Sequence, residues 1–136
     1  MIDPAVLQKV IAFKHQLHRH PELAGEEFAT CRLIRESIAT LGMEILPPFL
    51  KTDTVALLYG KGPGKNVTLR ADIDALKVVE ETGLSCASTV PGMMHACGHD
   101  AHTAMLYGAA LVLAERRHEF DGSVRFVWQP GEENLA

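Results

Sequence analysis

The sequence lacks the features that mark secreted, membrane-spanning or nucleic-acid-binding proteins. Only three of its 136 residues are cysteines, which excludes a paired disulfide framework and favours a cytoplasmic protein with reduced thiols. No apolar run approaches the roughly 20 residues of a transmembrane helix, and the first residues lack the basic and apolar regions of a signal peptide. Acidic residues (17) outnumber basic ones (13), so neither a nucleic-acid partner nor a membrane surface is expected.

The composition is that of a globular domain, because hydrophobic residues make up 47% of the chain and charged residues 22%. Apolar residues recur at three- and four-residue steps in three stretches, which predicts helices over residues 5–19, 26–41 and 101–118. Asp3 and Pro4 are a typical N-cap and first residue for the first helix. Cys31 lies on the apolar stripe of the second helix and is expected in the core.

Four β-rich runs predict strands over residues 43–46, 54–59, 67–71 and 123–128. The glycine-rich link at 60–66 lacks the spacing of a phosphate-binding loop, and it predicts a hairpin between the second and third strands. The third strand, the last helix and the fourth strand follow the order of a right-handed βαβ unit with parallel strands. The predicted fold class is therefore α/β, with a mixed sheet flanked by helices.

Chemically active side chains follow the strands of this βαβ unit. Ligands of open α/β sheets bind at the carboxyl ends of the strands, where this chain carries Asp72 and Asp74 after one strand and Glu132 and Glu133 after the other. The loop that enters the last helix adds imidazoles, a thiol and a carboxylate, namely His95, Cys97, His99, Asp100 and His102. Three separate segments thus bring metal-binding residue types to one edge of the sheet.

Each acidic group has an expected use at that edge. Adjacent residues of an extended segment point in opposite directions, so one of Glu132 and Glu133 can bind a metal while the other reaches a substrate. Asp72 and Asp74 share a face, and such a carboxylate can orient a metal-bound histidine. Asp100 is either a ligand or the N-cap of the last helix. Together these residues predict metal-assisted hydrolysis, with a carboxylate that takes and returns a proton.

Four stretches of the chain carry a family resemblance. They read LHRHPEL at 17–23, LRADIDAL at 69–76, MHACGHDAHT at 94–103 and QPGEE at 129–133. In this order they resemble the M20 family of metallopeptidases and amidohydrolases. The most similar branch is that of the N-acyl-amino-acid amidohydrolases, which includes hippurate hydrolases and auxin-conjugate hydrolases. Lys77 departs from this branch, which usually has proline there.

The resemblance implies a fold and a reaction. Residues 1–136 would form the N-terminal part of a zinc-exopeptidase-like catalytic domain, without the family's ferredoxin-like dimerisation domain. The implied reaction is hydrolysis of the amide bond of a small N-acyl amino acid, and the complete enzyme would be a homo-oligomer. Two further histidine ligands of the family lie beyond the matched residues, so the chain alone is expected to be inactive.

The resemblance also implies site residues. Cys97, His99 and Glu133 would be ligands of two divalent metal ions, whether zinc, manganese, nickel or cobalt. Glu132 would be the general base, and Asp74 would support the site. Asp72 falls where other branches of the family carry a histidine ligand, so the resemblance leaves its role open.

Two other functions remain open from the sequence. Cys97 beside His99 or His95 is also the pairing of a thiol hydrolase, although a separation of two residues suits a catalytic dyad poorly. A non-catalytic binding module on an M20-like scaffold is the third possibility. Among the other histidines, His18 and His20 are expected to be structural, while His95 and His102 either support the site or line a substrate pocket.

Overall fold

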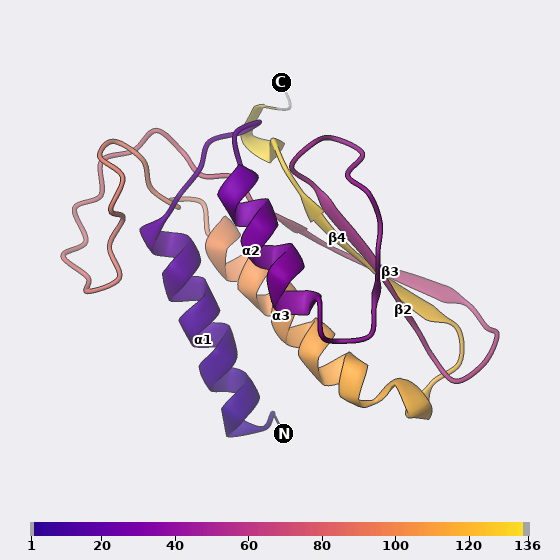
Figure 1. Cartoon of the computed structure of the whole chain (residues 1–136). Helices are drawn as coiled ribbons and strands as arrows, with labels where there is room; N and C mark the ends of the chain where they lie inside the picture. Colours follow the sequence, from indigo (N-terminus) through magenta and orange to yellow (C-terminus); the bar gives the residue numbers. More distant parts are fainter. Residues whose placement is uncertain (1, 135–136) are drawn as a thin grey trace.

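A computed structural model, which describes residues 2–134, shows helices packed on one side of a four-stranded sheet (Figure 1). The helices are α1 (Pro4–Arg19), α2 (Phe28–Ile38) and α3 (His99–Glu115), with short 3-10 helices at Arg117–Glu119 and Glu132–Asn134. The strands are β1 (Glu44–Ile45), β2 (Thr54–Tyr59), β3 (Asn66–Asp72) and β4 (Ser123–Gln129). The predicted α/β fold with a mixed sheet flanked by helices is confirmed.

The sheet has the strand order β1-β2-β4-β3. β3 and β4 are parallel neighbours joined through α3, with Val67 opposite Val124 and Asp72 opposite Gln129. This confirms the predicted βαβ unit. The register brings the carboxyl ends of β3 and β4 together, which is what positions the candidate site.

The predicted hairpin between β2 and β3 is wrong, because β4 lies between these strands and pairs antiparallel with β2. The glycine-rich link bonds to the chain entering β4 instead of closing a tight turn: Gly60 N donates to Gly122 O (2.8 Å), and Lys61 N donates to Phe120 O (2.9 Å). β4 takes the central position because its Phe126 and Trp128 are fully buried. Burial of these two large side chains outweighs the pairing of neighbouring strands.

The helix termini follow local hydrogen bonds. Asp3 caps α1, where its Oδ1 accepts a hydrogen bond from Ala5 N (2.9 Å), as predicted. α2 starts two residues later than predicted and stops at Ile38 rather than residue 41. Glu22 supplies the cap of α2, since its carboxylate accepts from Ala29 N (3.1 Å) and Thr30 N (2.6 Å).

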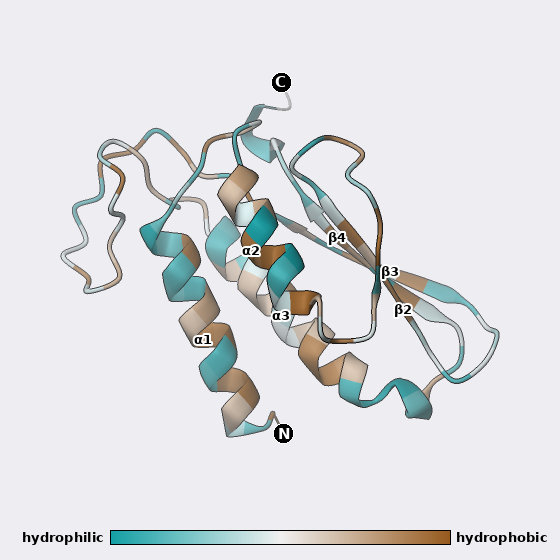
Figure 2. Cartoon of the chain, viewed as in Figure 1, coloured by the Kyte–Doolittle hydropathy of each residue, from teal (hydrophilic) through white to brown (hydrophobic). Residues whose placement is uncertain are grey.

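The core lies between the helices and the sheet. Fully buried side chains from α2 and the strands fill it, among them Ile34, Ile38, Leu58, Phe126 and Trp128. Cys31 is 7% exposed and lies in this buried face of α2, as predicted. In Figure 2 hydrophobic segments of α2, α3 and the strands lie in this layer, whereas α1 carries hydrophobic and hydrophilic residues in alternation along its length.

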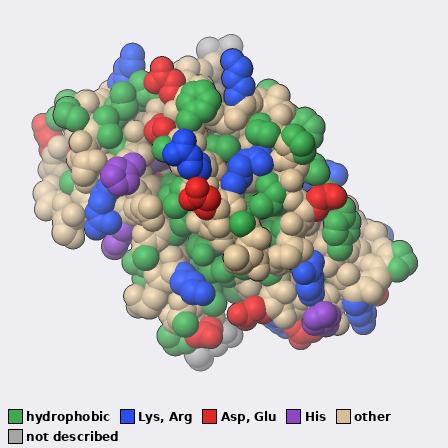
Figure 3. All heavy atoms as spheres, viewed as in Figure 1, with side chains coloured by type: hydrophobic (Ala, Val, Ile, Leu, Met, Phe, Trp, Pro, Cys, Tyr) green, Lys and Arg blue, Asp and Glu red, His purple; other side chains and the backbone are tan. Residues whose placement is uncertain are grey.

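Two surface features complete the description. None of the helices within residues 2–134 has both the length and the apolar character needed to cross a bilayer. On the face shown in Figure 3, basic and acidic side chains are interspersed over the helices rather than separated into patches of one sign.

Candidate metal centre

The candidate site lies where β3 and β4 end and α3 begins. Asp72 is the last residue of β3, His99 is the first residue of α3, and Glu132 lies three positions after the end of β4. Thr103 of α3 ties these elements together, because its hydroxyl donates to Asp72 O (2.9 Å) and its carbonyl accepts from the indole of Trp128 (3.3 Å). The structure thus gathers the three segments that the sequence analysis assigned to one edge of the sheet.

His99 is the centre of the cluster and is 3% exposed. Its Nδ1 lies 2.9 Å from Asp74 O and 3.1 Å from Asp74 Oδ1, so the ring donates an N–H from this side. In that tautomer Nε2 carries no proton and has a free lone pair. Nε2 lies 3.4 Å from Asp72 Oδ2, and 3.6 and 3.7 Å from carboxylate oxygens of Glu132 and Glu133.

Cys97 completes the predicted ligand set. Its sulfur, a ring nitrogen of His99 and a carboxylate oxygen of Glu133 all lie within 4.8 Å of one another. Cys97 is exposed, and the hydrogen bond to Glu133, followed by burial and the charge of Glu133, raises the pKa of its thiol. Without a cation in the cluster the thiol therefore stays protonated.

The donor set fits a divalent cation. Oε1 of Glu133 is buried and has no hydrogen-bond partner within residues 2–134, and a buried polar atom without a partner is costly. Lone pairs of imidazole and carboxylates converge there with a thiol that can lose its proton. Imidazole, thiolate and carboxylate are the ligands that zinc and neighbouring divalent ions prefer. A cation would satisfy all of these groups at once.

Asp74 holds two predicted ligands together. Its side chain is fully buried; Oδ1 faces His99 Nδ1, while Oδ2 accepts a hydrogen bond from Glu133 N (2.8 Å). A carboxylate that fixes the tautomer and orientation of a metal-binding histidine is typical of metal sites. Asp74 is therefore placed to orient the site, and does not line the exposed side.

The turn that carries Glu132 and Glu133 differs from the prediction. It is a 3-10 helix, Glu132–Asn134, rather than an extended segment, so the expected opposite directions of the two side chains are wrong. Gly131 has a φ of 69° and turns the chain at this point, and Asn134 N donates back to Gly131 O (3.3 Å). Both glutamates consequently approach the same histidine nitrogen.

Asp100 and the neighbouring histidines have other contacts. The alternative that Asp100 caps α3 is wrong, because Gly98 occupies the N-cap position and makes no side-chain cap. Asp100 Oδ2 lies instead 2.8 Å from His18 Nδ1 and 3.2 Å from Lys14 Nζ. His18 is buried, in agreement with a structural role.

His95 and His102 lie on different sides of the cluster. His95 is 5% exposed, and neither of its ring nitrogens has a hydrogen-bond partner within the described residues. Burial lowers the pKa of His95 to about 4, so the ring is neutral at pH 7. The side chain of His102 is half exposed, and its Nδ1 lies 2.7 Å from Asp72 Oδ1. Asp72 thus lies between the two imidazoles of α3.

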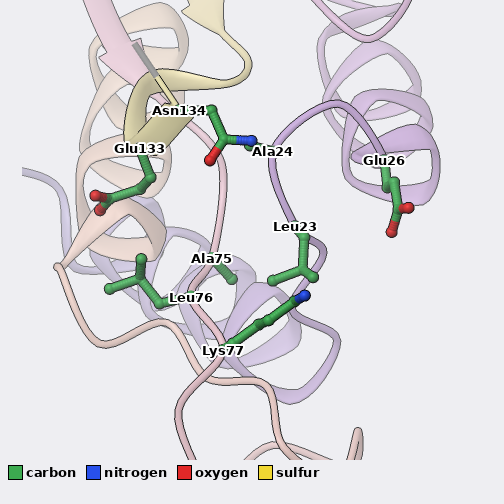
Figure 4. Close-up of a pocket in the computed structure, with 8 residues that line it drawn as sticks. All are labelled: Leu23, Ala24, Glu26, Ala75, Leu76, Lys77, Glu133 and Asn134. Carbon is green, nitrogen blue, oxygen red and sulfur yellow. The ribbon is translucent and has the colours of Figure 1, made fainter. Parts of the chain in front are cut away.

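A pocket of about 440 Å³ lies beside Glu133 (Figure 4). Three segments line it: the loop between α1 and α2, the stretch that follows β3, and the 3-10 turn after β4. Figure 4 shows the Lys77 side chain extending across this pocket towards Leu23. The eight lining residues are Leu23, Ala24, Glu26, Ala75, Leu76, Lys77, Glu133 and Asn134.

Comparison with known proteins decides the family. The profile of peptidase family M20/M25/M40 matches residues 68–136, the half of the chain that contains the whole cluster. The chain belongs to peptidase family M20/M25/M40. The stated resemblance to M20 amidohydrolases is thereby confirmed.

Several named proteins are similar to this M20 chain in sequence or structure. It is 46% identical over 137 residues to the N-acetylcysteine deacetylase of Bacillus subtilis, covering 100% of this chain and 36% of that protein. It is 44% identical over 124 residues to the N-acyl-L-amino acid amidohydrolase of Geobacillus stearothermophilus, covering 91% and 34%. The crystal structure of a dinuclear metal-binding M20 peptidase from Bacillus subtilis superimposes with a TM-score of 0.93 at 46% identity, covering 97% and 37%. The M20 chain spans about a third of the length of these relatives.

Glu27 is a residue of this site that the sequence analysis missed. It is fully buried, and its Oε2 accepts a hydrogen bond from Gly131 N (3.0 Å), next to Glu132. The sequence signal was that position 27 lies four residues before Cys31, and so falls on the apolar stripe of the predicted helix 26–41 that faces the core. Such a position is hard to recognise because Glu26 and Glu27 together read as an ordinary acidic helix start.

Proposed function

We propose that residues 1–136 are the N-terminal part of the catalytic domain of a metal-dependent amidohydrolase that cleaves the amide bond of N-acyl amino acids. The observation that carries the proposal is the convergence of Cys97, His99 and Glu133 within 4.8 Å, with Glu132 beside them. The names of the relatives, a deacetylase and an amidohydrolase, support this substrate class.

Each residue of the cluster has a role in this proposal. Cys97, His99 and Glu133 hold divalent cations, two in the complete enzyme. When bound, these ions polarise the amide carbonyl and make water more acidic. Glu132 takes the proton of the attacking water and returns it to the nitrogen of the leaving amino acid. Asp74 keeps the His99 ring and the Glu133 backbone in position through its two oxygens.

The pocket beside Glu133 is the proposed substrate side of the centre. Its volume of about 440 Å³ lies in the usual range for sites that bind small molecules. Lys77 offers an ammonium group there for the carboxylate of an amino-acid substrate. Such a contact would allow the pocket to accept an acidic ligand although the carboxylates of Glu26 and Glu133 also line it.

The raised pKa of the Cys97 thiol argues against the thiol-hydrolase alternative. A cysteine nucleophile needs a lowered pKa, supplied by a nearby cation or imidazolium. Here the hydrogen bond to Glu133, with the charges of Glu133, Glu132 and Asp72, acts in the opposite direction. The thiol is better suited to bind a metal ion, with release of its proton to solvent, than to attack a substrate.

Activity is tested in a chimera, because the chain alone is expected to have little or none. Residues 1–136 replace the matching third of the Bacillus subtilis deacetylase, and hydrolysis of N-acetylcysteine and of other N-acyl amino acids is measured. We expect turnover that falls by roughly 10³-fold or more in the Glu132→Gln chimera. A folded, metal-loaded chimera without turnover would favour the binding-module alternative.

A second arm separates metal from thiol chemistry. Chelation should abolish turnover, and zinc or manganese should restore it, whereas the Cys86→Ala chimera should retain activity because that thiol lies outside the cluster. Inactivation by iodoacetamide without any effect of the chelator would contradict the metal-dependent mechanism.

A further inference from the structure

Glu27 is a buried carboxyl group outside the predicted ligand set. Its side chain is 0% exposed, and burial of a group that can carry a charge is costly unless the fold gains something from it. It precedes α2 at the N-cap position, yet makes no side-chain cap there. The cap of α2 comes from Glu22 instead. The start of the helix therefore does not account for the Glu27 carboxyl.

The carboxyl group of Glu27 is directed at the turn after β4. Oε2 accepts a hydrogen bond from Gly131 N (3.0 Å), across 104 positions of sequence. Oε1 is buried and has no hydrogen-bond partner within residues 2–134. Burial raises the pKa of the Glu27 carboxyl, with the charge of Asp74 acting in the same direction. A neutral acid can still accept the Gly131 N–H, so the contact does not need the charge.

The turn is thus tied at two backbone amides by two buried carboxyl groups. Glu27 holds Gly131 N, and Asp74 holds Glu133 N (2.8 Å). Glu132 lies between the two tied amides. Gly131 has a left-handed φ of 69°, and the chain changes direction at this residue. Without a hydrogen bond to the Gly131 amide, the position of the next side chain, Glu132, would be less well fixed.

We propose that Glu27 is a positioning residue that fixes the Gly131–Glu133 turn through the Gly131 amide and so holds Glu132 and Glu133 against His99. This inference deepens the proposed function and rests on it. Glu27 acts through the turn and does not touch the metal ligands themselves. The proposal predicts that a hydrogen-bond acceptor at position 27 is required to hold the Gly131 amide, whereas a negative charge at this position is not.

The contact is tested by amide hydrogen exchange on the metal-free chain. Glu27→Met keeps the volume of the side chain and removes the acceptor, Glu27→Gln keeps the acceptor, and Glu36→Met on the exposed side of α2 is the matched control. We expect Gly131 N–H to exchange at least tenfold faster in Glu27→Met only, while Phe126 N–H in β4 stays unchanged in all variants. Equal Gly131 exchange in Glu27→Met and wild type would overturn the proposal, and faster exchange at Phe126 as well would reduce Glu27 to a general folding role.

A cobalt titration tests the consequence for the site. Loss of residues that orient metal ligands typically weakens metal binding roughly 10- to 100-fold, and we expect this loss in Glu27→Met but not in Glu27→Gln or Glu36→Met. Equal weakening in Glu27→Met and Glu27→Gln would overturn the acceptor argument. A wild-type chain that binds no cobalt would contradict the proposed function, and the exchange of Gly131 would then decide the positioning role alone.

Discussion

Two clusters of carboxylates surround buried histidines in this protein, and they differ in how well their charges are matched. Around His18, both ring nitrogens face carboxylate oxygens, Asp100 Oδ2 at 2.8 Å and Glu80 Oε1 at 2.9 Å, and the Lys14 ammonium lies 3.2 Å from Asp100 Oδ2. Around His99, one nitrogen faces three carboxylates at 3.4 to 3.7 Å. In the first cluster each carboxylate has a hydrogen-bond partner, whereas the carboxylates of the second cluster would need a cation to balance their charges.

The pKa values of the two clusters follow this difference. Burial alone would raise the pKa of Asp100, but the hydrogen bond from His18, the charge that His95 carries only in acid and the charge of Lys14 outweigh it, so the pKa is lowered. At the other cluster the carboxylates raise the pKa of the Cys97 thiol. Removing one partner from a matched cluster leaves a buried group unpaired and destabilises the fold, whereas an unmatched cluster is available to a ligand.

The largest expected effect comes from breaking the matched cluster. His18→Ala leaves Asp100 and Glu80 without the imidazole between them, and breaking such a buried pair costs about 3 kcal/mol of unfolding free energy. Urea denaturation of the metal-free chain measures this loss. The Glu119→Ala variant, which breaks an exposed pair with Arg116, is the control and should be indistinguishable from wild type. A comparable loss of unfolding free energy in both variants would show that the His18 cluster contributes no more than an exposed ion pair.

Around His99, the stability of the protein should depend on bound metal and should change little when one carboxylate is removed from the metal-free chain. Glu133→Ala removes one of several crowded carboxylates, so the metal-free chain should keep its stability. Zinc at 100 times its dissociation constant should stabilise the wild type by about 2.7 kcal/mol and leave Glu133→Ala unchanged. Thermal unfolding with and without zinc measures both. A large loss of stability in metal-free Glu133→Ala would show that the cluster is structural.

A smaller effect is expected from pH, through His95 between the two clusters. The pKa of His95 in the folded chain, about 4, lies below the ordinary imidazole value of 6.5, so the unfolded chain binds more protons between these pH values. The unfolding free energy of the metal-free chain should therefore fall as the pH drops, by about 2 kcal/mol between pH 7 and pH 4.5, and the loss due to His95 should level off below pH 4.

The His95→Gln variant isolates this contribution. Denaturation at pH 7 and pH 4.5 should show a smaller difference in His95→Gln than in wild type, while His118→Gln on the surface should match wild type. Identical pH dependence in all three proteins would mean that His95 does not resist protonation in the fold.

Much of the fold and of the site was predictable because local patterns determine it. Apolar spacing located α1 and α3, β-rich runs located the strands, and the βαβ order placed Asp72, His99 and Glu132 at one edge. The hairpin between β2 and β3 was wrong because pairing depends on β4, a later and more buried strand. The cap of α3 was wrong because the buried partner of Asp100 is His18, 82 positions away.

The parts of the site that sequence reasoning missed depend on contacts between distant segments. Glu27 is separated from Gly131 by 104 positions, and no periodicity records such a hydrogen bond. The turn after β4 makes this hydrogen bond and a second one, from Glu133 N to Asp74, which also joins distant segments. The candidate ligands and the supporting Asp74 were visible in the sequence, whereas the contact of Glu27 with Gly131 became visible only in three dimensions.

The most direct test of the unmatched cluster as a metal centre is a cobalt titration of the 136-residue chain followed by absorption spectroscopy. The account predicts saturable binding with a thiolate-to-cobalt charge-transfer band, lost in Cys97→Ala and Glu133→Ala and retained in Cys86→Ala. A wild-type chain without that band, or a band that persists in Cys97→Ala, would contradict the assignment of this cluster as the metal site.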